Sequence, residues 1–360
     1  MPSPNLIIDG RRLVKHSTGV GRYLGLLLNA WAAAPENLPF APLVKLHRPD
    51  RSNAEPWQAV FPSEATGSWL PGLAWENLCL ASGRHRHLLL FAPANLVPAR
   101  WSGPVVLVIH DTFAEYPDSG LTTLQNLRFR RRYRHAARRA DLILTPSQST
   151  ADDVQRFFQI SPNRIRVIRP GLPPDFKPCT PLQSQPTSLL IDEPFVLFVG
   201  KKSRRRAFDH LLQAVAHLRQ KGMRIRLVAV GPSLSRQITS DCLTDLGHVS
   251  DTTLIQLYRQ ARALVCPSSR EGFGLPVAEA MACGCPVVIL AQGALAEVAG
   301  NACLALAGQQ VADIASAISK LCENNSLREN LVEAGLVRAR LFQVNRFADE
   351  VASALAEFVG

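Results

Sequence analysis

Residues 271–288 read EGFGLPVAEAMACGCPVV, and this stretch decides the fold. Directly before it, residues 263–266 form an apolar run that is typical of a buried strand. After the glycines the chain is predicted to be helical, because Pro276 suits a first helical position, where it has no N–H to lose. Gly284 then supplies a helix stop. The stretch therefore predicts a strand, a glycine loop and a helix.

Two carboxylates, Glu271 and Glu279, bracket seven residues of this stretch. Glycines leave backbone N–H groups uncovered, and a helix N-terminus carries partial positive charge, so the loop favours an anion such as a phosphate. Carboxylates accept hydrogen bonds from hydroxyls. A phosphate next to a polyol is the chemistry of a nucleotide sugar. Gly-x-Gly alone also fits an ordinary strand–loop–helix crossover with glutamates on a solvated face.

Six further blocks support a more specific interpretation, and they lie at residues 18–23, 108–111, 145–150, 198–206, 246–251 and 293–300. Together with the stretch at 271–288, they resemble, in the same order, the motifs of family-4 retaining glycosyltransferases. The spacing of Glu271 and Glu279 resembles the Glu-x7-Glu signature of that family. This resemblance covers nearly the whole chain and implies the GT-B fold.

The domain organisation follows from the residues and from the resemblance. Strands that alternate with helices predict α/β domains with parallel, doubly wound sheets. Five prolines within residues 173–190 cannot continue a helix or a central strand, so we place a linker there. The resemblance implies two Rossmann-like domains that face a central cleft. We expect an acceptor-side domain at 1–172, a nucleotide-sugar-binding domain at 191–340, and a C-terminal helix at 341–360 that packs back on the first domain.

The apolar patterning also predicts individual elements. Helices are expected over residues 21–34 and 208–221. The expected strands are 6–8, 88–91, 105–109, 142–144, 195–199, 225–230, 263–266 and 287–290.

The resemblance assigns roles to individual side chains. Glu271 would position sugar hydroxyls and would not attack the sugar carbon. His110 would contact the transferred sugar from the first domain, opposite Glu271, although a histidine at a strand end also fits a core position. Arg205 and Arg206 would hold the diphosphate and stabilise the leaving group. The implied donor-binding residues are Gly19, Gly200, Arg205, Arg206, Val249, Gly272, Phe273, Gly274, Leu275 and Glu279.

The arginine pair departs from the family pattern. The position of Arg206 is usually lysine, and Ala207 stands where asparagine is common. The positive charge is kept, but the geometry of the phosphate contact is expected to differ.

The implied activity is transfer of a sugar from a nucleotide diphosphate to a hydroxyl, with retention at the anomeric carbon. The block at 18–23 and the strand end His110-Asp111 look most like those of bacterial polysaccharide enzymes that transfer mannose or rhamnose-type sugars. This likeness favours a GDP-linked donor, with UDP and dTDP open. The acceptor is expected to be a growing glycan or a lipid-linked molecule in bacterial surface polysaccharide synthesis. Because no Asp-x-Asp stands at a strand end, we expect metal-independent catalysis and no cofactor. Two alternatives are a nucleotide-sugar epimerase of the same fold and a non-catalytic protein that binds glycans or membranes.

The N-terminal glycines admit two other interpretations. The run Gly19-x-Gly21-x-x-x-Gly25 is close to a dinucleotide fingerprint but has one residue too many before its last glycine. No acidic residue follows at the end of a second strand, so a tight turn before a helix is the stronger alternative.

Composition agrees with a two-domain enzyme located in the cytoplasm. The chain has 360 residues, of which 47% are hydrophobic, enough for two cores. No apolar run of about 20 residues predicts a membrane span, and residues 1–10 lack the pattern of a secretory signal. Eight scattered cysteines fit reduced thiols, and the pair Cys283 and Cys285 has no second cluster that would complete a zinc site.

The net charge of +11 calls for a partner or a structural explanation. Its strongest source is a segment of helical character with arginines at 128, 130, 131, 132, 134, 138 and 139. This run fits an anionic membrane surface, which would place the protein on the inner face of the cytoplasmic membrane. It equally fits a solvated helix face paired with nearby acids. No nucleic-acid module is recognisable, so nucleic acid is not an expected partner.

Overall fold

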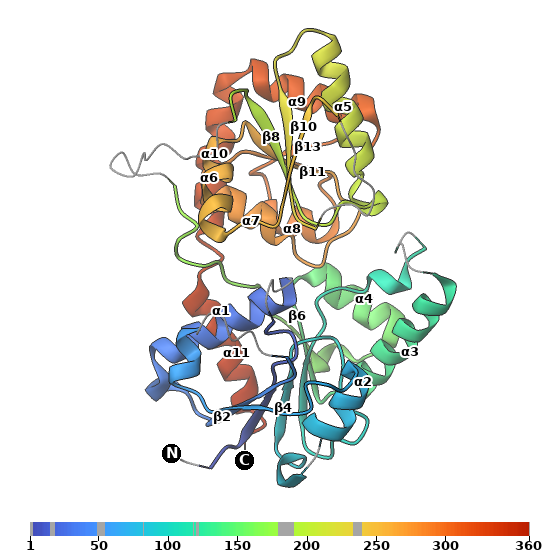
Figure 1. The fold of residues 1–360 in the computed structure, drawn as a ribbon, viewed down its shortest axis with the longest axis vertical. Coiled ribbons are helices and arrows are strands. Elements are labelled where there is room, and N and C mark those ends of the chain that lie inside the picture. Colours follow the sequence, from blue (N-terminus) through green and yellow to red (C-terminus); the bar gives the residue numbers. More distant parts are fainter. Residues whose placement is uncertain are drawn as a thin grey trace. The chain divides into compact units, whose positions relative to one another are not determined.

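A computed structural model describes residues 3–14, 19–48, 55–81, 83–117, 119, 122–178, 191–232 and 240–359. The chain divides into two compact units (Figure 1). The first, here the N-terminal unit, comprises Met1–Tyr116, Leu121–Gly171 and Phe342–Gly360. The second, the C-terminal unit, comprises Pro117–Gly120 and Leu172–Leu341.

The N-terminal unit is built on a parallel sheet of seven strands in the order β3-β2-β1-β4-β5-β6-β7. The order runs from β1 to one edge and then restarts at β4, so the connections reverse direction between β1 and β4. The strands are β1 (Leu6–Asp9), β2 (Pro42–Leu46), β3 (Ser63–Ala65), β4 (Leu89–Ala92), β5 (Val105–Val108), β6 (Leu142–Thr145) and β7 (Ile165–Val167). Its helices are α1 (Gly19–Ala33), α2 (Gly72–Trp75), α3 (Thr123–Arg139), α4 (Gln148–Phe158) and α11 (Val344–Ala356).

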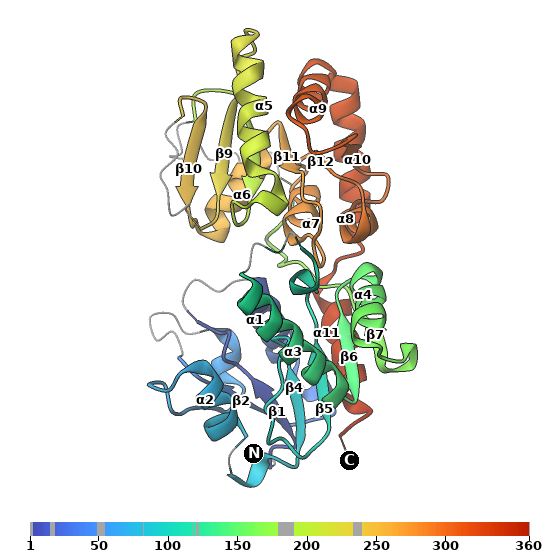
Figure 2. The same cartoon turned by 90° about the vertical axis from the view of Figure 1, so that its right-hand side faces the viewer.

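Both faces of this sheet are covered by helices. Alternate strand residues point to opposite sides and therefore pack into two different cores. Leu6 and Ile8 of β1 pack into a core with residues of α1 and α11, such as Leu24 and Val351. Ile7 packs into the second core with residues of α3 and α4. Figure 2 shows α3 and α4 beside β5 and β6. A sheet buried on both sides explains why its strands read as continuous apolar runs.

The C-terminal helix α11 belongs to the N-terminal unit and lies against α1 (Figure 1). Trp31 of α1 donates its indole N–H to the carbonyl of Ala348 at 3.1 Å. At the far end of α11, Arg166 of β7 pairs with Glu357, with 2.7 Å between Nη1 and Oε1. The last helix of the chain therefore closes one core of the first unit.

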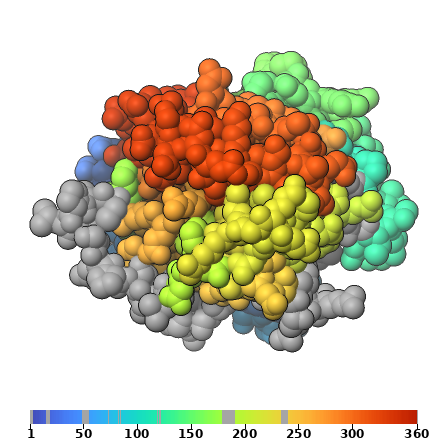
Figure 3. Space-filling view, turned by 90° about the horizontal axis from the view of Figure 1, so that it is seen from above, coloured from blue at the N-terminus to red at the C-terminus, as the bar shows by residue number. Residues whose placement is uncertain are grey.

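The C-terminal unit has a parallel sheet of six strands in the order β10-β9-β8-β11-β12-β13. The strands are β8 (Phe195–Val199), β9 (Arg226–Val230), β10 (Leu243–Gly247), β11 (Ala263–Cys266), β12 (Val287–Ile289) and β13 (Leu304–Ala305). Its helices are α5 (Phe208–Gln220), α6 (Asp251–Gln260), α7 (Leu275–Ala282), α8 (Gly293–Ala299), α9 (Val311–Glu323) and α10 (Asn325–Ala339). In Figure 3, α5 (yellow) lies alongside orange-red residues, and α9 is the helix that it packs against. The connections of this sheet reverse direction between β8 and β11.

The predicted fold class, two doubly wound α/β domains, is confirmed by these two parallel sheets. The expected strands are present within one or two residues, but β2, β3, β7, β10 and β13 were not predicted. The block at residues 18–23 resembles the N-terminal glycine loop of family 4, but the expectation of a loop is wrong for most of this block, because α1 already begins at Gly19. Thr18 lies outside the described residues, as does the proline-rich segment beyond residue 178.

Within the described parts of the chain, each helix is too short or too polar to cross a bilayer.

Candidate active site

The candidate site lies at the carboxyl edge of the C-terminal sheet, where β8 and β11 are neighbours. In doubly wound sheets, ligands bind outside the strand carboxyl ends at the point where the strand order reverses. β8 runs into Gly200 and the short 3-10 turn Arg204–Arg206. β11 runs into the loop that carries Glu271. The fold therefore brings the arginines and the glycine loop to one place.

Arg206 and Glu271 form a two-pronged ion pair at this place. The Nε atom of Arg206 lies 2.8 Å from Oε1 of Glu271, and Nη2 donates to Oε2 at 3.0 Å. Arg205 approaches the same carboxylate, with 3.5 Å between Nη1 and Oε1. The Oε1 atom is buried and accepts no well-aligned hydrogen bond from the described residues. A hydroxyl that arrives here would find a charged acceptor.

Backbone contacts hold the arginine turn against the glycine loop. The carbonyl of Arg205 accepts from the backbone N–H of Ser269 at 3.0 Å and from Gln309 Nε2 at 3.3 Å. Gln309 Nε2 also donates to the carbonyl of Pro267, and Gln292 donates to that of Ser269 at 2.7 Å. The relative position of the two arginines and the carboxylate is therefore fixed by several elements.

Two glycines make room for this arrangement. Gly200 has φ +133°, and a Cβ there would lie 1.8 Å from Nη1 of Arg206. Gly274 has φ +104°, and a Cβ there would lie 2.6 Å from Leu295. Both values of φ lie in the region that L side chains rarely adopt. Each glycine is favoured by its backbone conformation, and a Cβ at either position would force the neighbouring side chain to shift.

Gly274 is also the N-cap of α7, and Pro276 is the second residue of that helix. The helix presents its first N–H groups and the positive end of its dipole toward the loop. Phe273 is 6% exposed, whereas Gly272 and Leu275 are half-buried. The start of α7 thus provides a place for negative charge beside the arginines.

Glu279 lies further along α7 and is 2% exposed. It accepts a hydrogen bond from the hydroxyl of Tyr258 on α6, with 2.9 Å between Oη and Oε2. Sequence reasoning missed Tyr258, because a tyrosine at apolar helical spacing resembles an ordinary core residue. Val249 is half-buried and stands directly before Ser250, which caps α6 by accepting from Thr253 N–H.

His110 belongs to the N-terminal unit and follows β5. Its Nε2 lies 2.7 Å from the carbonyl of Pro93, and its ring meets that of Tyr23 edge-on at 4.9 Å. A carbonyl only accepts, so Nε2 carries the proton and Nδ1 is the acceptor in the neutral ring. Burial lowers the pKa of His110 to about 4, and the charge of Arg12 acts in the same direction. Near neutral pH the ring is therefore uncharged. Gly19, in the same unit, is exposed at the start of α1.

This pKa predicts an acid-side loss of stability. The pKa of His110 falls from 6.5 to about 4 on folding, so between these values the unfolded chain binds the proton more tightly. Stability contributed by the neutral ring is complete above 6.5 and is lost as pH falls toward 4. Between about pH 7.5 and pH 5, the free energy of unfolding, measured with denaturant, should fall by about 2 kcal/mol less in His110→Gln than in wild type. The exposed His135→Gln is the control, and identical pH slopes for wild type and His110→Gln would contradict the assignment.

The arginine run of α3 divides into two sets. Arg130 donates to the carbonyl of Ala114 at 2.7 Å, and Arg132 pairs with the buried Glu76 at 3.0 Å. Glu76 in turn pairs with Arg11. The exposed arginines are Arg128, Arg131, Arg134 and Arg138. Part of the predicted run therefore holds the N-terminal unit together.

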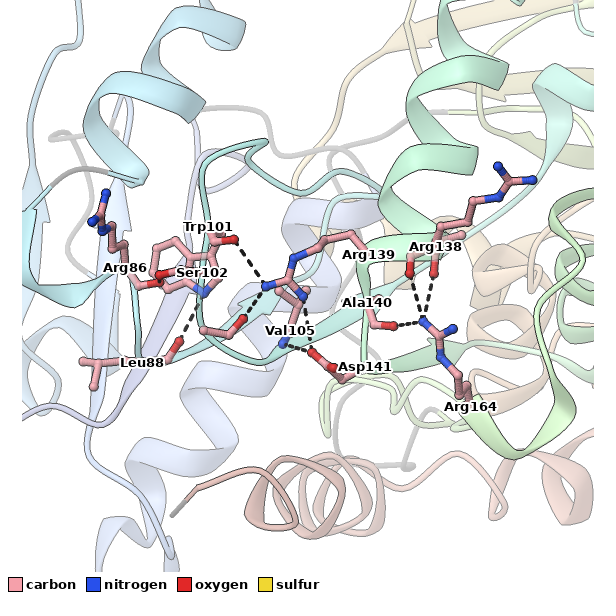
Figure 4. A network of polar contacts seen from close by, with 12 residues as sticks. Arg86, Leu88, Trp101, Ser102, Val105, Arg138, Arg139, Ala140, Asp141 and Arg164 are labelled. Atoms are coloured by element: carbon pink, nitrogen blue, oxygen red, sulfur yellow. Dashed lines mark hydrogen bonds and ion pairs between the residues drawn. The ribbon is translucent and has the colours of Figure 1, made fainter.

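The end of α3 shows this division clearly (Figure 4). Arg139 reaches inward to the carbonyl of Trp101 at 3.2 Å and lies 3.5 Å from Asp141 Oδ2. Arg164 donates to the carbonyl of Arg138 at 3.1 Å, whereas the side chain of Arg138 points away from this network. Neighbouring arginines of one helix thus have different surroundings.

In the described residues, no group of three or more histidine, cysteine or acidic side chains is arranged to hold a metal ion. Cys283 and Cys285 are buried free thiols, and burial raises the pKa of both.

Comparisons with known proteins agree with the two-unit architecture. Residues 183–338 match the model "Glycosyl transferases group 1", and residues 78–176 match "Glycosyltransferase Family 4". The solved structure of Anabaena HepE in complex with UDP and glucose superposes with a TM-score of 0.74 at 19% identity, over 98% of this chain and all of that one. Two doubly wound Rossmann-like units with this similarity define the GT-B class.

Two curated relatives narrow the class to a family. O-antigen chain mannosyltransferase B of Escherichia coli is 32% identical over 56% of this chain and 57% of its own length. D-inositol 3-phosphate glycosyltransferase of Actinosynnema mirum is 31% identical over 76% of this chain and 72% of its own length. The aligned chain thus spans little more than half of the first relative. The chain belongs to glycosyltransferase family 4.

Proposed function

We propose that this chain is a retaining glycosyltransferase that moves a sugar from a nucleotide diphosphate to a hydroxyl of a growing glycan or lipid-linked acceptor. The observation that carries the proposal is the contact of Arg205 and Arg206 with Glu271 at the carboxyl edge between β8 and β11. A diphosphate needs fixed positive charge, and a sugar needs a carboxylate acceptor beside it. Both groups lie within one cluster.

The proposed roles follow from this geometry. Arg205, Arg206 and the N-terminus of α7 would stabilise the charge that develops on the leaving diphosphate. Glu271 would accept hydrogen bonds from hydroxyls of the sugar, and Glu279 would accept hydrogen bonds from hydroxyls of the ribose. His110 belongs to the N-terminal unit, and its neutral acceptor nitrogen would accept a hydrogen bond from a sugar hydroxyl.

The donor is proposed from the relatives and the motif forms. The mannosyltransferase among the relatives favours a mannose-type sugar, which supports GDP as the nucleotide. HepE was solved with UDP and glucose, so UDP is the main alternative. The O-antigen mannosyltransferase also supports an acceptor in bacterial surface polysaccharide, whereas the D-inositol 3-phosphate glycosyltransferase supports a small phosphorylated acceptor.

A two-stage experiment tests this function. Thermal unfolding with GDP, UDP and dTDP identifies the base, because a ligand that binds only the folded state raises the midpoint. The matching nucleotide sugars are then incubated with and without candidate acceptors, and product stereochemistry is determined. Transfer with retention is expected. Conversion of the donor without an acceptor would instead identify a nucleotide-sugar epimerase.

Transfer is expected to continue after exhaustive EDTA treatment. The arginine pair can neutralise the diphosphate, and the described residues hold no cluster of metal-ligating side chains. Initial rates before and after chelation provide the measurement. An activity that EDTA abolishes and magnesium or manganese restores would rule out this metal-independent mechanism.

We also propose that the exposed face of α3 contacts an anionic membrane. At the start of α3, Leu124 and Leu127 are 56% and 63% exposed. Exposed arginines follow them along the helix at helical spacing. Apolar side chains that can enter the headgroup region, followed by cations, are typical of an interfacial helix. Each arginine near an anionic surface contributes about 1 kcal/mol.

Vesicle co-sedimentation tests this proposal. Wild type should bind vesicles that contain phosphatidylserine at low salt and dissociate near 1 M salt, where the Debye length is about 3 Å. Reversal to glutamate at the exposed Arg128, Arg131 and Arg138 should abolish binding, while reversal at Lys221, Lys320 and Arg340 of the other unit should preserve it. Arg132 is left intact because it holds Glu76. Absence of binding by wild type at low salt would show that α3 is simply solvated.

A further inference from the structure

Tyr258 is a buried tyrosine whose hydroxyl reaches one of the two carboxylates of the candidate site. Its side chain is 0% exposed, and Oη lies 2.9 Å from Oε2 of Glu279. An ionised carboxylate only accepts hydrogen bonds, so the tyrosine must be the donor. The single hydroxyl proton of Tyr258 is therefore directed at Glu279.

The position of the tyrosine is fixed independently of this bond. Its ring packs against Phe176, with 6.3 Å between the centroids and 60° between the planes. The next residue of α6, Arg259, donates to the carbonyl of Lys177 at 3.1 Å and 2.8 Å. Because packing and backbone contacts hold α6, the hydroxyl stands at a defined place before any ligand binds.

The last torsion of a glutamate is broad, so a carboxylate without directional contacts samples many orientations. A hydrogen bond to a charged acceptor is short and directional. We propose that Tyr258 is a positioning residue for nucleotide recognition, whose hydroxyl orients Glu279 toward the ribose hydroxyls of a nucleoside diphosphate. This inference rests on the proposed function, in which Glu279 holds the ribose.

Tyr258→Phe tests the proposal, because it keeps the ring against Phe176 and removes only the hydroxyl. Dissociation constants would be measured calorimetrically for the nucleoside diphosphate that wild type binds and for its 2′,3′-dideoxy counterpart. The ribose nucleotide should bind about tenfold more weakly to the variant, as expected for one hydrogen bond to a charged group. The dideoxy nucleotide should bind both proteins within about twofold, because it has no hydroxyl for Glu279 to accept.

A matched control is available in the other unit. Tyr116 also donates its hydroxyl to a carboxylate, with 2.5 Å between Oη and Oδ1 of Asp153. Tyr116→Phe should leave both dissociation constants unchanged. In the Glu279→Gln background, Tyr258→Phe should add little further loss for the ribose nucleotide, since coupled residues are not additive.

The outcomes separate this inference from the proposed function. Equal weakening of both nucleotides in a folded Tyr258→Phe protein would mean that the hydroxyl supports only the fold, and would overturn the inference. Unchanged binding of both nucleotides would overturn it as well. If Glu279→Gln itself does not distinguish the two nucleotides, the ribose role of Glu279 fails, and the role of Tyr258 fails with it.

Discussion

Replacing Glu271 by alanine is expected to lower kcat/KM for sugar transfer by about a hundredfold or more. The substitution removes the carboxylate that would hold sugar hydroxyls and that pairs with the guanidinium of Arg206. A hundredfold loss corresponds to about 3 kcal/mol of transition-state stabilisation, which is typical of one preorganised polar contact at a reacting centre. Steady-state kinetics with the identified donor and acceptor provide the measurement.

The control for this prediction is Glu193→Ala. Glu193 also pairs with an arginine of the C-terminal unit, with 2.5 Å between its Oε2 and Nη1 of Arg219. It precedes β8 and so lies at the amino edge of the sheet, away from the candidate site. The control should retain wild-type kinetics, whereas a folded Glu271→Ala protein with near-normal turnover would remove Glu271 from the site.

Binding of the nucleoside diphosphate without its sugar separates the two contacts of Glu271. Glu271→Gln keeps the shape of the side chain but removes the charge that neutralises Arg206. Without that carboxylate, Arg206 has more positive potential for the diphosphate, so affinity should be equal to or higher than that of wild type. Turnover should nevertheless fall, because Glu271 acts on the sugar. Weaker binding of the sugar-free nucleotide would mean that Glu271 contacts the nucleotide directly.

The local parts of the site were predictable from sequence because their signals are local. Apolar runs such as 195–199 and 263–266 predict buried strands, and the glycines after them mark a backbone that side chains would obstruct. Gly200 and Gly274 indeed adopt positive φ. The doubly wound order then brings the ends of β8 and β11 together, which no single segment encodes by itself.

Contacts between distant residues were not predictable in the same way. Arg206 and Glu271 are 65 residues apart, and Arg132 meets Glu76 across 56 residues. Nothing in the arginine run distinguishes Arg132 from the exposed Arg131, because only the tertiary neighbour differs. The edge strand β10 was also missed, since its residues are partly exposed and lack an apolar run. Sequence patterns report burial along one element, whereas these features depend on its partners.

Replacing Arg206 by alanine is expected to have an effect of similar size, with a loss of about a hundredfold in kcat/KM. The guanidinium of Arg206 lies closer to Glu271 than that of Arg205 does, at 2.8 Å against 3.5 Å, and it would also contact the donor diphosphate. Its removal leaves Glu271, whose side chain is 13% exposed, without its main counter-charge, so an anionic donor would meet an uncompensated carboxylate. Affinity for the nucleoside diphosphate should therefore fall together with turnover, which distinguishes this variant from Glu271→Gln.

Arg206→Lys is the informative companion, because the resemblance to family 4 places a lysine at this position. A lysine keeps the charge but cannot reproduce the two-pronged contact with Glu271, since its ammonium is a point charge. We expect Arg206→Lys to retain activity within about tenfold of wild type, because the loss of one contact costs roughly 1.4 kcal/mol, which is a factor of ten. Arg219→Ala, which removes the partner of Glu193, should be neutral for catalysis. If Arg206→Lys is as inactive as Arg206→Ala, the fork geometry matters more than the charge, and if Arg206→Ala is fully active, the diphosphate is held elsewhere.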